Sequence, residues 1–366
     1  MTKVLLLRAD ATSPNLGVRV LKEGTEALVR RAFGPQTTVH VQNFDGGDTG
    51  VKFNRETVAK DVFRPNGPVK AVLRKYDLVI DVCGGDSFTD IYGAKRLALI
   101  LYTQWMSQRL GIPTILGPQT IGPFTKRLSR YLAGRSLRRM ALVLSRDNAS
   151  EKEAAALGRP VDLSATDVVF ALPRPQARRQ SGVIINVSGL LWEKNSHVDA
   201  EEYRSNIRRL ISALLERGKL VTLLAHVLDN PRSDNDVPPV KLLAAEFEGR
   251  VATAIPKSLT DVRELVAGAE LVIGSRMHAC LNALSSGAPA IPWAYSRKFE
   301  PLLNDIGWTH MVDLRTEKDP VAATTQILDA VGTEQLHAEV VRVLESIDNR
   351  LQPVVDALSR VELKND

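Results

Sequence analysis

Short apolar runs alternate along this chain with segments that carry apolar residues at helical spacing. In the first half, the predicted strands are 3–8, 38–44, 78–82, 114–116, 142–145 and 168–172. The helical patterns between them cover 16–33, 94–110, 126–140 and 149–157. Strands that alternate with helices in this way predict a parallel sheet with helices on both faces.

The alternation stops at 173–181 (PRPQARRQS), where prolines and polar residues indicate a linker. It then restarts, with strands at 183–187, 220–225, 271–274 and 290–293, and helices at 201–216 and 239–247. A long helical pattern, 334–363, closes the chain and could pack back across the first domain. The pattern therefore predicts an α/β protein of two doubly wound Rossmann-like domains, 1–175 and 182–332, followed by a C-terminal helix in 333–366. We expect a ligand cleft where the two domains face each other.

Composition places the chain among ordinary globular enzymes. It has 366 residues, 44% of them hydrophobic and 25% charged, which is enough for two domains. The longest apolar run near its start, 4–7, is too short for a signal peptide or a membrane span. Cys83 and Cys280 lie in apolar segments and make no disulfide framework, so we expect buried thiols. These features predict a cytoplasmic protein.

The formal net charge of +6 suits anionic partners. Nucleic-acid binding would also require a concentrated basic face with aromatic platforms. Only 5% of the residues are aromatic, so we predict no nucleic-acid partner. The densest basic run, 126–139, has helical spacing, and we interpret it as a solvated helix face. Attraction to an anionic membrane surface or to a lipid-linked pyrophosphate is the weaker alternative.

Two basic clusters follow predicted strands in segment 271–306. The first stands where a helix begins, and the second follows the next strand; they comprise Ser275, Arg276, Met277 and His278, and Arg297 and Lys298. The carboxyl ends of parallel strands bind ligands, and a helix N-terminus attracts anions. We therefore expect a site for a small, multiply charged anion, with His278 in proton transfer. For Arg297, a solvated surface charge is an equally good interpretation.

Strand ends in the first half carry further polar groups. Arg146 follows strand 142–145 and is our candidate for a cation on the opposite wall, with Asp147 holding it or capping the next helix. Glycine-rich loops let a ligand approach the backbone, although neither a GxGxxG fingerprint nor a P-loop is present. A dehydrogenase is therefore disfavoured. The loop residues assigned to acceptor binding are Gly84, Gly85 and Asp86, then Gln119 and Asn15.

His226 lies near Asp234 and Asp236 in the sequence, which raises the question of a metal. Their spacing fits no compact ligand motif, and a polar loop at a strand end explains it better. We predict no obligatory metal and no cofactor.

Several segments together resemble the polysaccharide pyruvyl transferase family. They are GGDSFTDIYG at 84–93, GPQTIGPF at 117–124, LSRDNAS at 144–150, TDVVFAL at 166–172 and GSRMHACLNALSSGAPAIPWAYSRKFEPLL at 274–303. The last segment is highly specific, and the resemblance extends from the first strand to about residue 310. It implies a GT-B-like arrangement and transfer of the enolpyruvyl group of phosphoenolpyruvate to sugar hydroxyls, giving a pyruvate ketal and phosphate. Phosphoenolpyruvate would be a co-substrate.

In the resemblance, the donor-binding and catalytic positions correspond to Arg146, Arg276, His278 and Lys298. Ser275, Met277 and Arg297 surround them as further donor contacts. We expect the cations to hold the donor's phosphate and carboxylate, with Arg146 reaching across from the other domain. His278 would act as the acid that protonates the donor or as the base that activates the sugar hydroxyl; the sequence leaves both open.

The chain departs from the family pattern in two loops. Cys83 stands where the family often has the first of three glycines, and Val18-Arg19 stand where an acidic residue usually follows Asn-x-Gly. Both loops lie on the expected acceptor side, so the acceptor is less defined than the donor. We expect a sugar or a lipid-linked oligosaccharide, and the inner face of the cell membrane is an alternative location. The sequence leaves both monomer and oligomer open.

Two other functions remain open at this stage. A nucleotide-sugar glycosyltransferase of GT-B type would use the same basic helix start for a diphosphate. A non-catalytic anion- or glycan-binding protein would bind the donor without turning it over.

Overall fold

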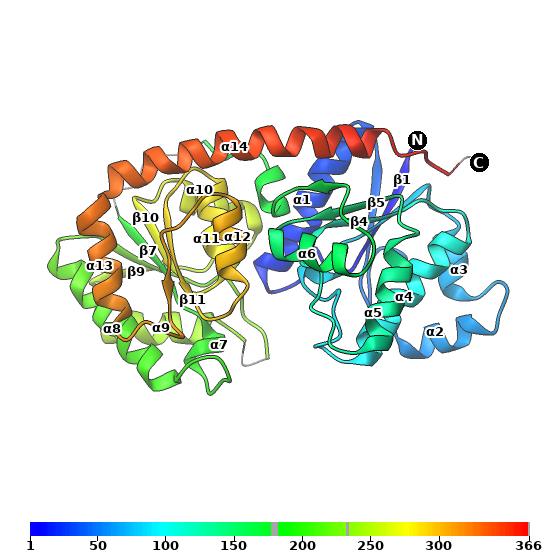
Figure 1. The fold of residues 1–366 in the computed structure, drawn as a ribbon. Helices are drawn as coiled ribbons and strands as arrows, with labels where there is room; N and C mark the ends of the chain where they lie inside the picture. Colours follow the sequence, from blue (N-terminus) through cyan, green and yellow to red (C-terminus); the bar gives the residue numbers. More distant parts are fainter. Residues whose placement is uncertain (177–181, 232–233, 365–366) are drawn as a thin grey trace. The chain divides into compact units, whose positions relative to one another are not determined.

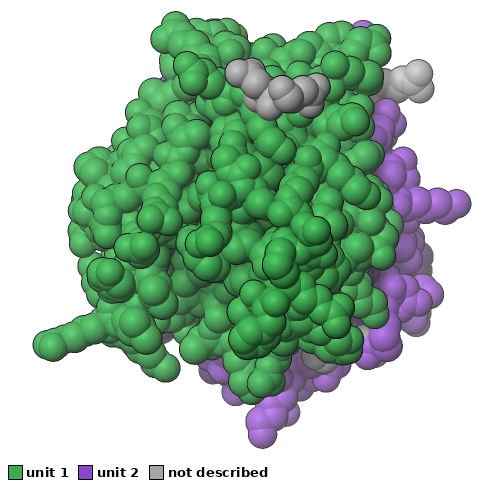
Figure 2. Space-filling model, turned by 90° about the vertical axis from the view of Figure 1, so that its right-hand side faces the viewer, with its two compact units in different colours: residues 1–12, 18–172, 347–366 green, residues 13–17, 173–346 purple. Residues whose placement is uncertain are grey.

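The computed structural model describes residues 1–176, 182–231 and 234–364. The chain forms two compact units, distinguished by colour in Figure 2. Unit 1 comprises 1–12, 18–172 and 347–366, and unit 2 comprises 13–17 and 173–346. The sequence-based boundaries stay predictions. The units add two details that the sequence did not suggest: segment 13–17 groups with unit 2, and the C-terminal helix is shared between the units.

Unit 1 is built on a parallel six-stranded sheet of order β2-β1-β3-β4-β5-β6. Figure 1 labels β1, β4 and β5 of this sheet. The strands are β1 (Lys3–Leu7), β2 (Thr38–Gln42), β3 (Leu78–Asp81), β4 (Thr114–Gln119), β5 (Leu142–Ser145) and β6 (Leu163–Ser164). β3, β4 and β5 are buried along their whole length. Strands covered on both faces tolerate few polar residues, which is why these runs read as continuously apolar.

Helices cover both faces of this sheet. They are α1 (Leu16–Phe33), α2 (Arg55–Val62), α3 (Pro68–Leu73), α4 (Ala94–Arg109), α5 (Arg127–Leu137), α6 (Asn148–Ala156) and the end of α14 (Thr333–Ser359). One apolar cluster joins α2, α3 and α4 to Leu5 and Val79, and a second joins α4, α5 and α6 to Leu116 and Val143. Leu5 pairs in register with Val79, and Leu116 pairs with Val143. Helices α2 to α6 therefore pack on the same face.

Unit 2 repeats the plan with a parallel sheet of order β12-β11-β10-β7-β8-β9. Its strands are β7 (Val183–Asn186), β8 (Val221–Leu224), β9 (Val251–Ala254), β10 (Leu271–Gly274), β11 (Ala290–Ala294) and β12 (Val312–Asp313). Its helices are α7 (Gly189–Trp192), α8 (Ala200–Glu216), α9 (Val237–Glu246), α10 (Leu259–Ala267), α11 (Met277–Ser285), α12 (Phe299–Asp305), α13 (Pro320–Val331) and the start of α14. The prediction of two Rossmann-like sheets is confirmed.

One predicted strand is wrong. Residues 168–172 were expected to pair in the sheet, but Val168–Ala171 forms a short 3-10 helix. The side chain of Asp167 accepts the N–H of Val169 and starts that turn, while Leu163 and Ser164 take the edge position beside β5. An apolar run alone cannot distinguish a buried turn from a strand. Of the predicted linker, 177–181 lie outside the described residues.

The C-terminal helix ends earlier than predicted and returns to unit 1 as the sequence suggested. Its last turns bury Ile347, Leu351, Val354 and Leu358, and the Arg350 guanidinium donates to the carbonyl of Ala165. Among the described residues, no helix has the length and the apolar run needed to cross a bilayer.

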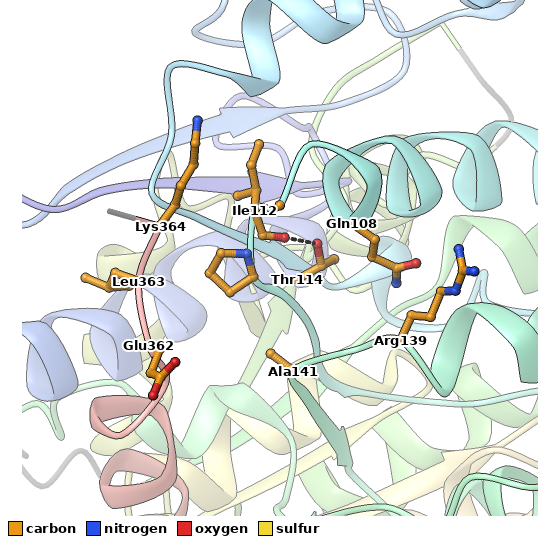
Figure 3. A pocket seen from close by; sticks show the side chains of 10 residues that line it. Gln108, Ile112, Thr114, Arg139, Ala141, Glu362, Leu363 and Lys364 are labelled. Carbon is orange, nitrogen blue, oxygen red and sulfur yellow. Dashed lines mark hydrogen bonds between the residues drawn. The ribbon is translucent and has the colours of Figure 1, made fainter. Parts of the chain in front are cut away.

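A surface hollow of about 700 Å³ opens beside the chain end in unit 1 (Figure 3). Thr114 begins β4 and Ala141 precedes β5, so the hollow lies at the amino edge of the sheet. The backbone N–H of Lys364 donates to the carbonyl of Asp77 at 3.1 Å, which fixes the tail as one wall. Ligands of open α/β sheets bind at the opposite edge, beyond the carboxyl ends of the strands.

Candidate active site

The start of α11 is the centre of the site in unit 2. β10 ends at Gly274, and Ser275 and Arg276 lead directly into the helix. The N–H of Arg276, the N-cap, donates to Oδ1 of Asn186 at the end of β7 (2.9 Å). The Ser275 hydroxyl lies 3.0 Å from the Tyr203 hydroxyl on α8. Two neighbouring strands and a helix thus hold this turn, which places the N-terminus of α11 at the carboxyl edge of the sheet.

The Arg276 side chain is not an open anion clamp. It is buried, its Nε and Nη2 lie 3.2 and 2.7 Å from Oδ1 of Asp236, and Nη2 also pairs with Asp234. Burial alone would lower the pKa of Arg276, but the two carboxylates outweigh it and raise that pKa. Nη1 makes no hydrogen bond to any residue that the structure describes, so part of the guanidinium stays available for a ligand oxygen.

Asp236 organises the loops around the site. Its carboxylate accepts the backbone N–H groups of Gly189 (2.7 Å), His226 (3.1 Å) and Val227 (2.9 Å) in addition to Arg276. A fully buried carboxylate requires this many donors, because an unpaired buried charge is strongly destabilising. Asn186 and Tyr203 were not singled out from the sequence, and Asp236 was considered there only as a possible metal ligand beside His226. A polar residue at the end of an apolar strand, as at Asn186, was the only local signal.

His278 lies in the first turn of α11 and is half-buried. It packs against Gly17, which belongs to the same unit. A Cβ at Gly17 would lie 2.9 Å from Nδ1 of His278 and 3.0 Å from its Cβ. Only glycine leaves room for the imidazole at this approach. The segment that carries Gly17 is fixed to the loop after β8 by the N–H of Leu16, which donates to the His226 carbonyl (3.2 Å).

His226 is buried and has a structural role. One ring nitrogen lies 3.1 Å from the side-chain nitrogen of Asn282 on α11. Burial, and then the charges of His278 and Arg276, hold the pKa of His226 well below its usual value. With Asp236 occupied by backbone donors and Arg276, the described residues hold no cluster of three potential metal ligands. The absence of an obligatory metal stays a prediction.

The second basic cluster follows β11. Lys298 is half-buried at the start of α12, and Arg297 is exposed. The ring of Tyr295 contacts those of His197 (5.0 Å between centroids) and Phe299 (5.5 Å). Burial raises the pKa of Tyr295, and the charges of Arg276 and Lys298 act against that shift. That Lys298 and Arg276 bind one ligand together stays a prediction.

Unit 1 holds Arg146 beyond β5. Its Nη1 lies 3.0 Å from Asp167 and its Nε 3.0 Å from the Thr120 hydroxyl, and the side chain is almost fully buried. Asp147 caps α6 by accepting the N–H of Ser150 and lies only 3.9 Å from Arg146. The sequence left Asp147 with two interpretations, and capping is the closer contact.

The loop after β3 contains Cys83, Gly84, Gly85 and Asp86. Cys83 has φ +44°, in the left-handed region that favours glycine, and its N–H donates to Asp81 (2.9 Å). A glycine, which the family resemblance leads us to expect at this position, would adopt this conformation without strain. Gly85 approaches Arg146, because a Cβ there would lie 3.7 Å from Nη1. Asp86 accepts from the Tyr92 hydroxyl at 2.8 Å.

Two predicted acceptor residues have unexpected positions. Gln119 is fully buried in β4, in register with Ser145, so it does not face solvent. Asn15 bridges to Val227 and belongs to unit 2, although the sequence assigned it to the first domain. Its side chain accepts the N–H of Gly17 at 2.9 Å and shapes the turn beside His278. Acceptor binding by both residues stays a prediction.

Together the two sheets define a GT-B-like protein of two Rossmann-like units with polar, charged strand ends. Two solved structures share this fold. They are MnaA from S. aureus, solved with UDP (13% identity, 98% of both chains, TM-score 0.58), and the UDP-GlcNAc 2-epimerase from Methanocaldococcus jannaschii (12% identity, 94% of this chain and 100% of the other, TM-score 0.57). At this identity they show the fold alone.

The sequence comparisons go further. The family model for polysaccharide pyruvyl transferase matches residues 15–297. The chain is also 24% identical to the amylovoran biosynthesis protein AmsJ from Erwinia amylovora, over 75% of this chain and 70% of AmsJ. The protein belongs to the polysaccharide pyruvyl transferase family and is a transferase.

Proposed function

We propose that the enzyme transfers the enolpyruvyl group of phosphoenolpyruvate to two hydroxyls of a sugar in a polysaccharide or its precursor. The products would be a cyclic pyruvate ketal and phosphate. The observation that supports this most is the grouping of Arg276 and His278 at the start of α11, directly after the carboxyl end of β10. Cations and helix N–H groups at one sheet edge suit a donor that carries a phosphate and a carboxylate.

The chemistry needs one acid and one base. A proton is added to the donor's methylene carbon, which becomes a methyl group, while a sugar oxygen bonds to the adjacent carbon and loses its own proton. A second hydroxyl then displaces phosphate from that carbon, and its proton leaves with the phosphate. The proton given to carbon is thus balanced by the proton taken from the first hydroxyl.

We assign the acid–base role to His278, since it is half-buried at the helix start and its ring is positioned by Gly17. Nη1 of Arg276, Lys298 and the N–H groups at Ser275 and Met277 would bind the donor, with Arg297 at the rim. Arg146 is the proposed catalytic residue of unit 1, and its guanidinium is already oriented by Asp167 and Thr120.

The acceptor is proposed to be a sugar or a lipid-linked oligosaccharide that contacts the loop of Gly84, Gly85 and Asp86. Phosphoenolpyruvate is the proposed co-substrate, and we propose no cofactor. The proposed location is the cytoplasm, where phosphoenolpyruvate would be the soluble donor.

The test is an incubation of the purified protein with phosphoenolpyruvate and candidate oligosaccharides, and with nucleotide sugars in parallel. We expect phosphate release with a new ketal methyl signal in the NMR spectrum of the sugar. Release of a nucleoside diphosphate, with phosphoenolpyruvate unchanged, would instead identify a glycosyltransferase. Lys298→Ala should raise the KM for phosphoenolpyruvate, and Lys241→Ala, on the exposed side of α9, should leave it unchanged.

A further inference from the structure

Large apolar side chains are exposed on two neighbouring helices of unit 1. We call these side chains the α5 face: Trp105 on α4 (39% exposed), and Leu128 (68%), Tyr131 (59%) and Leu132 (39%) on α5. Residues 128, 131 and 132 have the spacing that places side chains on one side of a helix. α4 and α5 lie side by side, joined by Gln108, whose amide donates to the Ser136 carbonyl (3.1 Å) (Figure 1).

The α5 face is not ordinary surface scatter. In the described part of unit 2, the exposed large apolar residues stand on separate elements; they are Leu220, Leu242, Ile255 and Val341. Isolated exposed apolar residues are normal on soluble proteins, whereas a cluster marks an interaction surface. A solvated helix face, the interpretation favoured from sequence, accounts for the arginines of α5 but not for Leu128 and Tyr131.

Positive charge surrounds the α5 face. Segment 126–139 contains no Asp or Glu. Its exposed cations Lys126, Arg127, Arg135 and Arg139 form no ion pair with the residues that the structure describes. Arg109 stacks on Trp105 at 5.6 Å, which adds a further cation beside the indole. The nearby carboxylate of Glu153 is already paired with Arg130, so it does not offset these charges.

We infer that the α5 face docks on the surface of an anionic phospholipid bilayer. Trp and Tyr prefer the headgroup level, leucines enter the acyl boundary, and Arg and Lys pair with lipid phosphates. Neither a free anion nor a nucleic acid would use Leu128 and Leu132. The inference goes beyond the proposed function, because donor turnover on a soluble sugar would not require it.

Vesicle flotation of the full chain tests the inference. One set of vesicles is phosphatidylcholine alone, and the other contains phosphatidylglycerol as well. We expect binding to the anionic vesicles only, reversed by raising the salt concentration because exposed charges are screened. Equal binding to both sets, binding that resists salt, or no binding at all would each overturn the inference.

Two variants separate the apolar and the charged contributions. Leu128→Ser with Tyr131→Ser should weaken vesicle partitioning at least about 25-fold, since burial of each side chain contributes more than about 1 kcal/mol. Arg127→Gln with Arg135→Gln should weaken it roughly 25-fold, because each cation near an anionic surface contributes about 1 kcal/mol, about fivefold. Circular dichroism checks that both variants keep the fold.

The matched control is Leu242→Ser with Lys241→Gln on α9 of unit 2, another exposed leucine beside an exposed lysine. It should bind vesicles like the wild type, and an equal loss would overturn the assignment to the α5 face. Size-exclusion chromatography provides a further check. If the wild type is a dimer that Leu128→Ser with Tyr131→Ser converts to a monomer, the α5 face is an interface between copies and not a membrane surface.

Discussion

Each unit has a buried arginine–aspartate ion pair just beyond the carboxyl end of a strand, but the residues around the pair differ. In unit 1, Arg146 follows β5 and pairs with the buried Asp167; in unit 2, Arg276 follows β10 and pairs with the buried Asp236. Unit 2 adds His278 at the start of a nine-residue helix, whereas unit 1 adds a glycine loop. An arginine at a strand end, paired with a buried aspartate, therefore occurs with and without a histidine beside it. The proposed proton transfer depends on the histidine of unit 2.

Removal of the imidazole gives the largest expected effect. His278→Ala should lower kcat by about 10²–10⁴-fold, the usual loss for a positioned acid or base, while the fold is retained. Phosphate release from phosphoenolpyruvate in the presence of acceptor is the measurement. His337→Ala, at a histidine on α14, is the control and should retain full activity. An active His278→Ala enzyme would remove the chief difference between the units.

The two buried pairs should differ in their contribution to stability. Asp236→Ala should lower the free energy of unfolding by about 3–5 kcal/mol, because it leaves three buried backbone N–H groups without an acceptor and leaves Arg276 with Asp234 as its remaining carboxylate. Asp167→Ala should cost less, since Arg146 keeps Thr120 and has Asp147 at 3.9 Å. Urea denaturation of both variants measures the difference. If the two losses are equal, the extra donors of Asp236 carry no net stability.

Gly17 allows the position of His278 to be tested without changing the histidine. Gly17→Ala introduces a Cβ 2.9 Å from Nδ1, so the imidazole must shift. We expect a fall in kcat of about 10- to 100-fold, as for a misplaced catalytic group. Stability should change by no more than about 1 kcal/mol, because alanine suits a helix better than glycine. Val18→Ala is the neighbouring control. Unchanged kcat in Gly17→Ala would show that this contact does not position the ring.

The buried His226 makes the stability of unit 2 depend on pH. Burial lowers the pKa of His226, so the unfolded chain takes up a proton near pH 6.5 while the folded state resists it. Its contribution to stability is complete above that pH. It is lost by up to about 1.4 kcal/mol per pH unit as the pH falls below about 6.5. Urea titrations between pH 7 and pH 5, compared with His226→Gln, isolate this slope. Equal slopes would mean that His226 is not the group responsible.

Glycine in place of each buried cysteine should change stability by different amounts. Cys83→Gly loses a small buried side chain but removes the strain of a left-handed backbone conformation, which costs a non-glycine residue about 1–2 kcal/mol. The net change in the free energy of unfolding should therefore stay within about 1 kcal/mol. Cys280→Gly, inside α11, should cost about 2 kcal/mol from lost burial and helix propensity. Thermal unfolding compares them, and a large loss in Cys83→Gly would contradict the strain at this position.

Much of the fold could be predicted from the alternation of apolar runs and helical patterns. α1 and β5 have the predicted bounds, and β10, α11 and β11 follow in the predicted order. The errors fall on short or atypical elements. The 3-10 turn at 168–171 was mistaken for a strand, and α2, α3, β9, α10, β12 and α13 were not predicted. Short amphipathic segments span too few helical or strand periods for the sequence pattern to identify them.

For the candidate site, the sequence determined where the charged residues lie along the sheet, and the tertiary structure determined which residues they contact. Parallel strands bring their carboxyl ends to one edge, so Arg276 after β10 and Lys298 after β11 had to lie at that edge. That Asp236, 40 residues away, pairs with Arg276, and that Gly17 packs on His278, depended on how distant loops fold over that edge. Such contacts arise between segments with no shared local pattern, which is why only the assembled structure could reveal them.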